Sequence, residues 1–195
     1  MNAHRISVCF FSSGIAVAAI LAVAQQRPVR IPHVRSGRAE LLQRGRDTIL
    51  ELSPPKGPVQ RIALTHPSDY RQGTAAPFDA RLIAESVHHF LIFTDRFASN
   101  PGNIQGKCGA SETGERFVHV VSLGGIPHET LSTLVESCLL DLEATPASPE
   151  WLAKPDSAGS VGQLVIRFEP GKQPTAVYYV RPDGSVSRPE IKPTS

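Results

Sequence analysis

The chain has 195 residues, with 20 Lys and Arg against 18 Asp and Glu and a formal net charge of +2. This length suits one domain with a sizeable hydrophobic core. The nearly balanced charge argues against a dedicated polyanion binder, which carries a strongly basic face, so we expect no nucleic acid partner. The 17 Pro and 15 Gly favour short strands and loops over long helices.

Residues 1–24 have the three-part pattern of a secretory signal peptide. A short polar start precedes an apolar run over residues 6–21, and Ala22-Val23-Ala24 forms a small-residue cleavage site. We therefore expect an exported chain, periplasmic or extracellular, that begins at Gln25 after cleavage. The alternative is an uncleaved signal anchor that tethers the protein to the membrane, because residues 6–24 have about the length needed to cross a bilayer.

Residues 25–46 form an arginine-rich lead-in that offers little apolar surface to offset the entropy of ordering. The composition predicts a partly disordered tail in front of a single globular domain over residues 47–195. Weak contact of the tail with an anionic surface of a cell envelope is a second interpretation. The arginines that would make this contact are Arg27, Arg30, Arg35 and Arg38.

The first half of the domain combines strand signals with one predicted helix. Residues 48–52 and 59–64 predict two strands across a Pro- and Gly-containing turn. A polar loop follows from residue 66 to residue 77. Apolar residues on a helical stripe over residues 82–90 then predict a helix capped by Asp79. The apolar run 90–93 predicts a buried strand.

The second half begins with another buried-strand signal over residues 116–123. Apolar residues at helical spacing predict a helix within residues 130–143, although a strand stays open there because some of the same residues alternate. A Pro- and Ser-rich loop covers residues 144–160. Three final strands are predicted at residues 163–168, 175–181 and 185–191, with Asp183-Gly184 as the last hairpin turn.

This order of elements predicts an α+β fold, a mainly antiparallel sheet with one or two helices packed on one face. Loss of Cys9 with the signal peptide leaves Cys108 and Cys138, an even pair in an oxidising compartment. We therefore expect one disulfide between them. The wide spacing of the two cysteines is unlike the C-x-x-C arrangement of redox pairs.

Three histidines form the candidate polar site. His88 and His89 lead into one predicted buried strand, and His119 lies within another. If these strands are neighbours, the imidazoles share a face of the sheet, and Asp95 or Asp141 supplies a carboxylate. The chain lacks H-E-x-x-H and the other standard zinc signatures, so the sequence assigns no metal or cofactor. A core histidine with a satisfied hydrogen bond is the alternative for His119.

Trp151, in an otherwise polar loop, either anchors that loop to the core or presents an aromatic platform to a ligand. No G-x-S-x-G motif for serine chemistry is present. We therefore expect a small exported module without catalytic activity that binds an envelope protein or polymer, or has a structural role. Its expected binding loops are 98–114 and 145–160. The alternative is an envelope hydrolase or metal-dependent enzyme centred on His88, His89 and His119.

Overall fold

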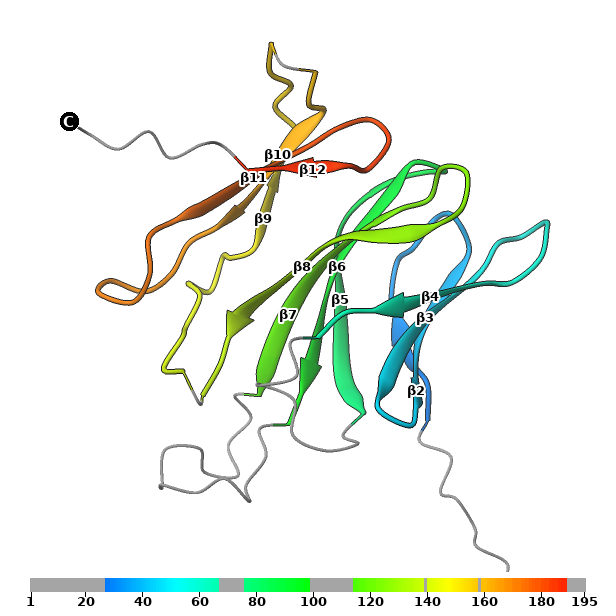
Figure 1. Ribbon diagram of the computed structural model, residues 1–195, viewed down its shortest axis with the longest axis horizontal. Coiled ribbons are helices and arrows are strands. Elements are labelled where there is room, and N and C mark those ends of the chain that lie inside the picture. The colour runs from blue at the N-terminus through cyan, green and yellow to red at the C-terminus, as the bar shows by residue number, and fades with distance from the viewer. Residues whose placement is uncertain (1–26, 67–75, 99–113, 139, 158, 189–195) are drawn as a thin grey trace, which may run out of the picture.

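Every regular element in the described part of the chain is a β-strand (Figure 1). The computed structural model describes residues 27–66, 76–98, 114–138, 140–157 and 159–188. The twelve strands form three antiparallel sheets of four strands each. Within each sheet, strands that follow one another along the chain lie side by side, so each sheet is a meander without crossover connections.

The three sheets follow one another along the chain. The first contains β1 (Val29–Ile31), β2 (Arg38–Arg44), β3 (Asp47–Ser53) and β4 (Gln60–Leu64). The central sheet contains β5 (Pro77–Ser86), β6 (Phe90–Phe97), β7 (Glu115–Ser122) and β8 (His128–Glu136). The third contains β9 (Glu150–Leu152), β10 (Gly162–Ile166), β11 (Ala176–Val180) and β12 (Val186–Ser187). Figure 1 shows the central sheet lying between the other two.

The central sheet is covered on both faces, which explains the apolar runs in its sequence. Along β6, Leu91 and Phe93 join the core against the first sheet, whereas Phe90 and Ile92 join the core against the third. This alternation is the two-residue period of a strand. Because both faces are buried, the two runs predicted as buried strands, 90–93 and 116–123, have no polar face.

The helix expected after Asp79 is wrong, because these residues form β5, which pairs with β6. The pairing shifts register between Leu82 and Ala84. Leu82 therefore packs toward the first sheet, while Ile83 and Ala84 pack toward the third. A bulge breaks the two-residue alternation of buried side chains, and the resulting spacing resembles one helical stripe.

The helix expected within residues 130–143 is also wrong, and the strand alternative is confirmed over β8. The pairing of β7 with β8 has two register shifts, one between Arg116 and Phe117 and one between Val120 and Val121. Leu131 and Val135 both join the core of the third sheet. Their spacing of four residues suits a strand and a helix alike. A turn closed by the bridge between Ser137 and Leu142 follows. The described fold is thus all-β and not α+β.

The expected disulfide is not part of the described architecture. Cys138 is the one cysteine among the described residues, so no disulfide joins two of them. Cys108, the expected partner, falls in residues 99–113, outside the described residues. Strand pairing and two hydrophobic cores hold the described fold together.

The arginine-rich lead-in contains two strands, β1 and β2, and is not a tail. Ile31, Ala39 and Leu41 are fully buried against the central sheet. Few apolar residues suffice, because a strand on an outer sheet buries only every second side chain. The predicted signal peptide, residues 1–24, lies outside the described residues. No helix in the described ranges has the length and apolarity needed to span a bilayer.

Candidate functional site

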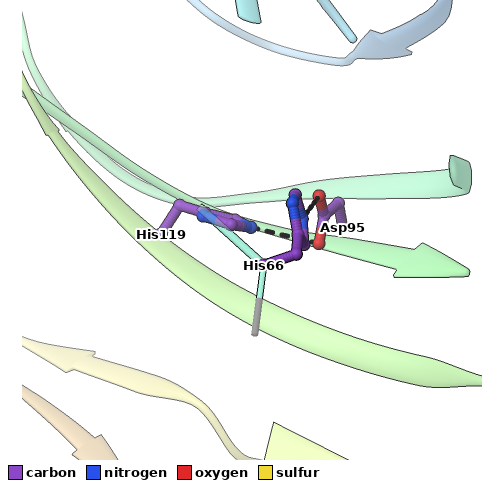
Figure 2. Close-up of side chains that lie close together, drawn as sticks. All are labelled: His66, Asp95 and His119. Atoms are coloured by element: carbon purple, nitrogen blue, oxygen red, sulfur yellow. Dashed lines mark hydrogen bonds and ion pairs between the residues drawn. The ribbon is translucent and has the colours of Figure 1, made fainter. Parts of the chain in front are cut away.

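Three ionisable side chains meet on the face of the central sheet that packs against the first sheet (Figure 2). His119 on β7 pairs directly with Phe93 on β6, and Asp95 follows Phe93 by two residues on the same face. His119 Nε2 lies 3.1 Å from Asp95 Oδ1. His66, which follows β4, places its Nε2 2.8 Å from Asp95 Oδ2. Since an ionised carboxylate only accepts hydrogen bonds, His66 Nε2 is the donor.

The edge strand β8 fixes the position of His66. The backbone N–H of Thr65 donates to Glu129 Oε2 at 2.7 Å, and the hydroxyl of Ser132 donates to the carbonyl oxygen of Thr65 at 2.5 Å. Both backbone polar groups of Thr65 are therefore bonded to β8. These two hydrogen bonds hold the segment that follows β4 against the central sheet.

Glu129 also joins the cluster directly, because its Oε1 lies 2.6 Å from His119 Nδ1. His119 is thus placed between two carboxylates, with Asp95 at one ring nitrogen and Glu129 at the other. The continuous chain of polar contacts runs Glu129–His119–Asp95–His66. It links β8, β7, β6 and the segment after β4.

The cluster is enclosed by aromatic rings. The side chains of Asp95 and His119 are 0% exposed, and that of His66 is 1% exposed. The ring of Phe93 stacks on His119 with centroids 5.1 Å apart, and the rings of Phe97 and Phe117 each meet His66 edge-on at 4.8 Å. In such a water-poor environment each electrostatic contact is stronger than it would be at the surface.

The charges of Asp95 and His119 stabilise each other against the effect of burial. Burial raises the pKa of Asp95, but the charge of His119, together with the hydrogen bond and charge of His66, outweighs burial and holds that pKa at about 2. Burial lowers the pKa of His119, but Asp95 and Glu129 outweigh it and raise the pKa to about 9. At neutral pH the pair is therefore a carboxylate and an imidazolium.

Some polar atoms of the cluster have no hydrogen-bond partner. His66 Nδ1, Asp95 Oδ1 and His119 Nε2 are buried and lack a hydrogen-bond partner in the described structure. The contact between Asp95 Oδ1 and His119 Nε2 is an ion pair without the alignment of a hydrogen bond. Buried polar atoms are usually satisfied, so these atoms need an explanation.

The structure brings together only part of the predicted polar site. His119 and Asp95 meet, as expected for histidine and aspartate on neighbouring strands. His88 and His89 are exposed in the turn between β5 and β6 and do not join buried His119. Asp141 instead pairs with Lys172 at 2.6 Å.

The sequence prediction missed His66 and Glu129. His66 was expected in a loop with no partner, and Glu129 was expected beside a helix. Of the two, only Glu129 carried a usable signal: on a strand next to β7 it comes within reach of His119, since side chains on one face of paired strands are neighbours.

The four arginines that were expected to contact an anionic surface are exposed, and two of them have acidic partners. The guanidinium of Arg35 pairs with Glu85, with Nε 3.6 Å from Oε2. Arg38 pairs with Glu40 at 2.6 Å. Arg27 is exposed. Part of the positive charge expected to meet an anionic surface is therefore neutralised within the protein.

A pocket of about 400 Å³ lies between the central sheet and the third sheet. It brings His89, from the turn before β6, to Trp151 on β9. Its volume is in the range of small-molecule sites. The lining residues are Glu85, Ser86, His89, Phe90, Trp151, Ala153, Val161 and Pro182.

Trp151 anchors β9 to the core while one side of it lines this pocket. Its ring lies 5.6 Å from that of Phe90, tilted by 57°. On the adjacent strand, a Cβ at Gly162 would lie 2.3 Å from Trp151 Cζ2. Glycine at position 162 therefore makes room for the indole ring.

Gly162→Ala is expected to lower the free energy of unfolding by about 1–3 kcal/mol, because the added methyl group forces the indole ring out of its place. Urea unfolding followed by circular dichroism measures the change. Gly124→Ala is the control, because a Cβ at that position meets no atom within 4 Å and the residue has no positive φ. Its expected change in the free energy of unfolding is within about 0.5 kcal/mol. An unchanged Trp151 emission spectrum in Gly162→Ala would contradict the crowding.

No family model, curated protein or solved structure matches this chain.

Proposed function

We propose that the chain is an exported binding module without catalytic activity, and that its ligand site is the pocket between His89 and Trp151. One observation supports this proposal: exposed His89 and one side of the Trp151 ring line the same pocket between two sheets. The cluster of His66, Asp95 and His119 supports a structural role instead, since its side chains are at most 1% exposed. A substrate would have no path to them without local opening of the fold.

The lining of the pocket favours a ligand with one apolar face and a polar edge. Trp151 and Pro182 offer apolar surface, while His89 and Ser86 offer hydrogen-bonding groups. A saccharide unit has this character, because its ring carbons form an apolar face and its hydroxyl groups lie around the edge. We therefore propose a saccharide unit of an envelope polymer as the ligand.

Trp151 provides the test, because it is the single tryptophan of the chain. Because Trp151 lines the pocket, its fluorescence reports on a ligand bound there. Titration of the mature protein with soluble oligosaccharides should give a saturable change in emission. His89→Ala removes a hydrogen-bonding group and should weaken binding by about tenfold. His128→Ala is the matched control, since His128 is also an exposed histidine but does not line this pocket.

Three results would overturn the proposal. The first is that no oligosaccharide gives a saturable response, whether or not proline-rich peptides give one. The second is equal affinity in wild type and His89→Ala, which would place the ligand elsewhere. The third is equal loss of affinity in His89→Ala and His128→Ala.

A further inference from the structure

We propose that His66, Asp95 and His119 bind a divalent first-row transition-metal ion, best represented by Zn²⁺. One donor atom from each of the three residues lies within 4.8 Å of the other two. Two imidazole nitrogens and one carboxylate oxygen are a donor set that zinc, iron and copper accept. This inference goes beyond the proposed function, because the cluster and the His89–Trp151 pocket share no residue.

The unsatisfied atoms of the cluster support a bound cation. His119 Nε2 and Asp95 Oδ1 are buried, face each other at 3.1 Å and make no hydrogen bond within the described structure. With His119 neutral and its Nε2 unprotonated, a cation between the two atoms would give the lone pair of each a partner. The ion pair alone leaves both buried atoms without a hydrogen bond, which is unusual in a folded protein.

Glu129 contacts the proposed ligand His119 at the ring nitrogen that faces away from the cation. Its Oε1 lies 2.6 Å from Nδ1 of His119, so that ring nitrogen is engaged and Nε2 is left for the cation. Histidine ligands of metals commonly donate their second N–H to a carboxylate, which fixes the tautomer and orients the ring. The same Glu129 accepts from the backbone of Thr65 and so also holds the segment that carries His66.

The charge balance of the cluster also favours a divalent ion. Asp95 and Glu129 bring two carboxylates into a site walled by Phe93, Phe97 and Phe117. A divalent cation with two neutral imidazoles would neutralise both carboxylates. An apolar wall disfavours any uncompensated charge, so this neutral arrangement is stable there.

Binding requires a small closure of the cluster. Donor atoms on a tetrahedral zinc ion are about 3.3 Å apart when each metal–ligand distance is about 2.0 Å. Asp95 Oδ1 and His119 Nε2 already meet this spacing at 3.1 Å. The widest donor pair, at 4.8 Å, must approach by about 1.5 Å. We assign this movement to rotation of the His66 ring, which contacts the rings of Phe97 and Phe117.

The test is zinc binding by the mature chain after chelator treatment and dialysis. Calorimetric titration with Zn²⁺ should show one equivalent bound, and the melting temperature should rise. X-ray absorption at the zinc edge of wild-type protein should show two imidazoles in the first shell. This spectroscopic arm needs no variant, so it does not depend on a substituted chain folding.

Variants then assign the ligands. His66→Gln, checked for folding by circular dichroism, should bind zinc at least about a hundredfold more weakly, and Glu129→Gln about 10- to 100-fold more weakly. His88→Asn and His128→Gln alter exposed histidines outside the cluster and should bind as wild type does. Asparagine is chosen at position 88 because His88 has a positive φ of 67°, which asparagine tolerates.

Three outcomes would overturn the metal site. The first is less than about a fifth of an equivalent of zinc bound at saturation. The second is a zinc edge spectrum with fewer than two imidazoles. The third is wild-type affinity in a folded His66→Gln variant, which would assign the bound zinc to surface histidines.

Discussion

Asp95→Ala is expected to lower the free energy of unfolding of the chelator-treated protein by about 3–5 kcal/mol. The carboxylate of Asp95 is fully buried and contacts both His66 and His119. Its removal leaves a buried imidazolium at His119 with Glu129 as its remaining partner. The large effect comes from the charge left behind and not from the net strength of the ion pair. Urea unfolding at pH 6 measures it.

Asp79→Ala is the matched control on the same sheet, because Asp79 is exposed on β5. Its expected effect is within about 0.5 kcal/mol. The double variant Asp95→Ala/His119→Gln tests the mechanism further. If the unpaired imidazolium causes the loss, His119→Gln should restore part of the stability, and the coupling between the two positions should reach about 0.5–3 kcal/mol. Equal stability of Asp95→Ala and Asp79→Ala would show that the cluster is not a structural centre.

Buried strands were predictable here, and bulged strands were not. The runs 90–93 and 116–123 lie in a sheet with two covered faces, so an unbroken apolar run was enough to identify β6 and β7. The neighbouring strands β5 and β8 have bulges that shift one side chain to the other face. A shift of this kind converts a spacing of two between buried side chains into a spacing of three, which is typical of a helix.

Composition misled the interpretation of residues 25–46 for a different reason. Arginines dominate the segment, yet an outer strand needs few apolar side chains. Ala39 and Leu41 alternate with Arg38 and Glu40, and only the alternate positions enter the core. The average polarity of the segment hides this alternation, whereas the two-residue period of its apolar side chains shows it.

The site was half predictable. Placement of His119 and Asp95 on neighbouring strands needed only the order of two adjacent buried strands, which a short chain path makes the default. His66 enters from another sheet through backbone bonds of Thr65 to Glu129 and Ser132. No local sequence pattern encodes contacts between sheets, since they depend on how the sheets pack.

The stability of the chelator-treated protein is expected to be highest between pH 3.8 and 6.5 and to fall as the pH rises toward 9. In the folded chain the carboxylates of Asp95 and Glu129 raise the pKa of His119 from 6.5 to about 9, against the opposing effect of burial. The folded state therefore binds this proton more tightly than the unfolded state. Its contribution is fully present below pH 6.5 and is lost as the pH rises through 9.

Asp95 gives the opposite sign at low pH. Burial opposes its charge, but His119 and His66 lower its pKa from 3.8 to about 2. Its contribution is present above pH 3.8 and is lost as the pH falls through 2. Because the two groups stabilise each other, the two contributions overlap and do not add. The alkaline loss alone amounts to about 3 kcal/mol.

Unfolding in urea at pH 6, 7.5 and 9 measures the alkaline loss, and His119→Gln identifies its source. Other groups titrate as the pH rises, so the wild-type curve alone does not isolate one histidine. Glutamine at position 119 has no charge to lose, so the variant should be less stable at pH 6 and should lose about 3 kcal/mol less than wild type between pH 6 and 9. His128→Gln removes an exposed histidine and should keep the wild-type slope. Equal slopes in wild type and His119→Gln would mean that the buried imidazolium does not exist at pH 6. In that case His119 would be neutral at pH 6 and its titration would cause no loss of stability at alkaline pH. Asp95 and Glu129 would then not stabilise the fold through the charge of His119.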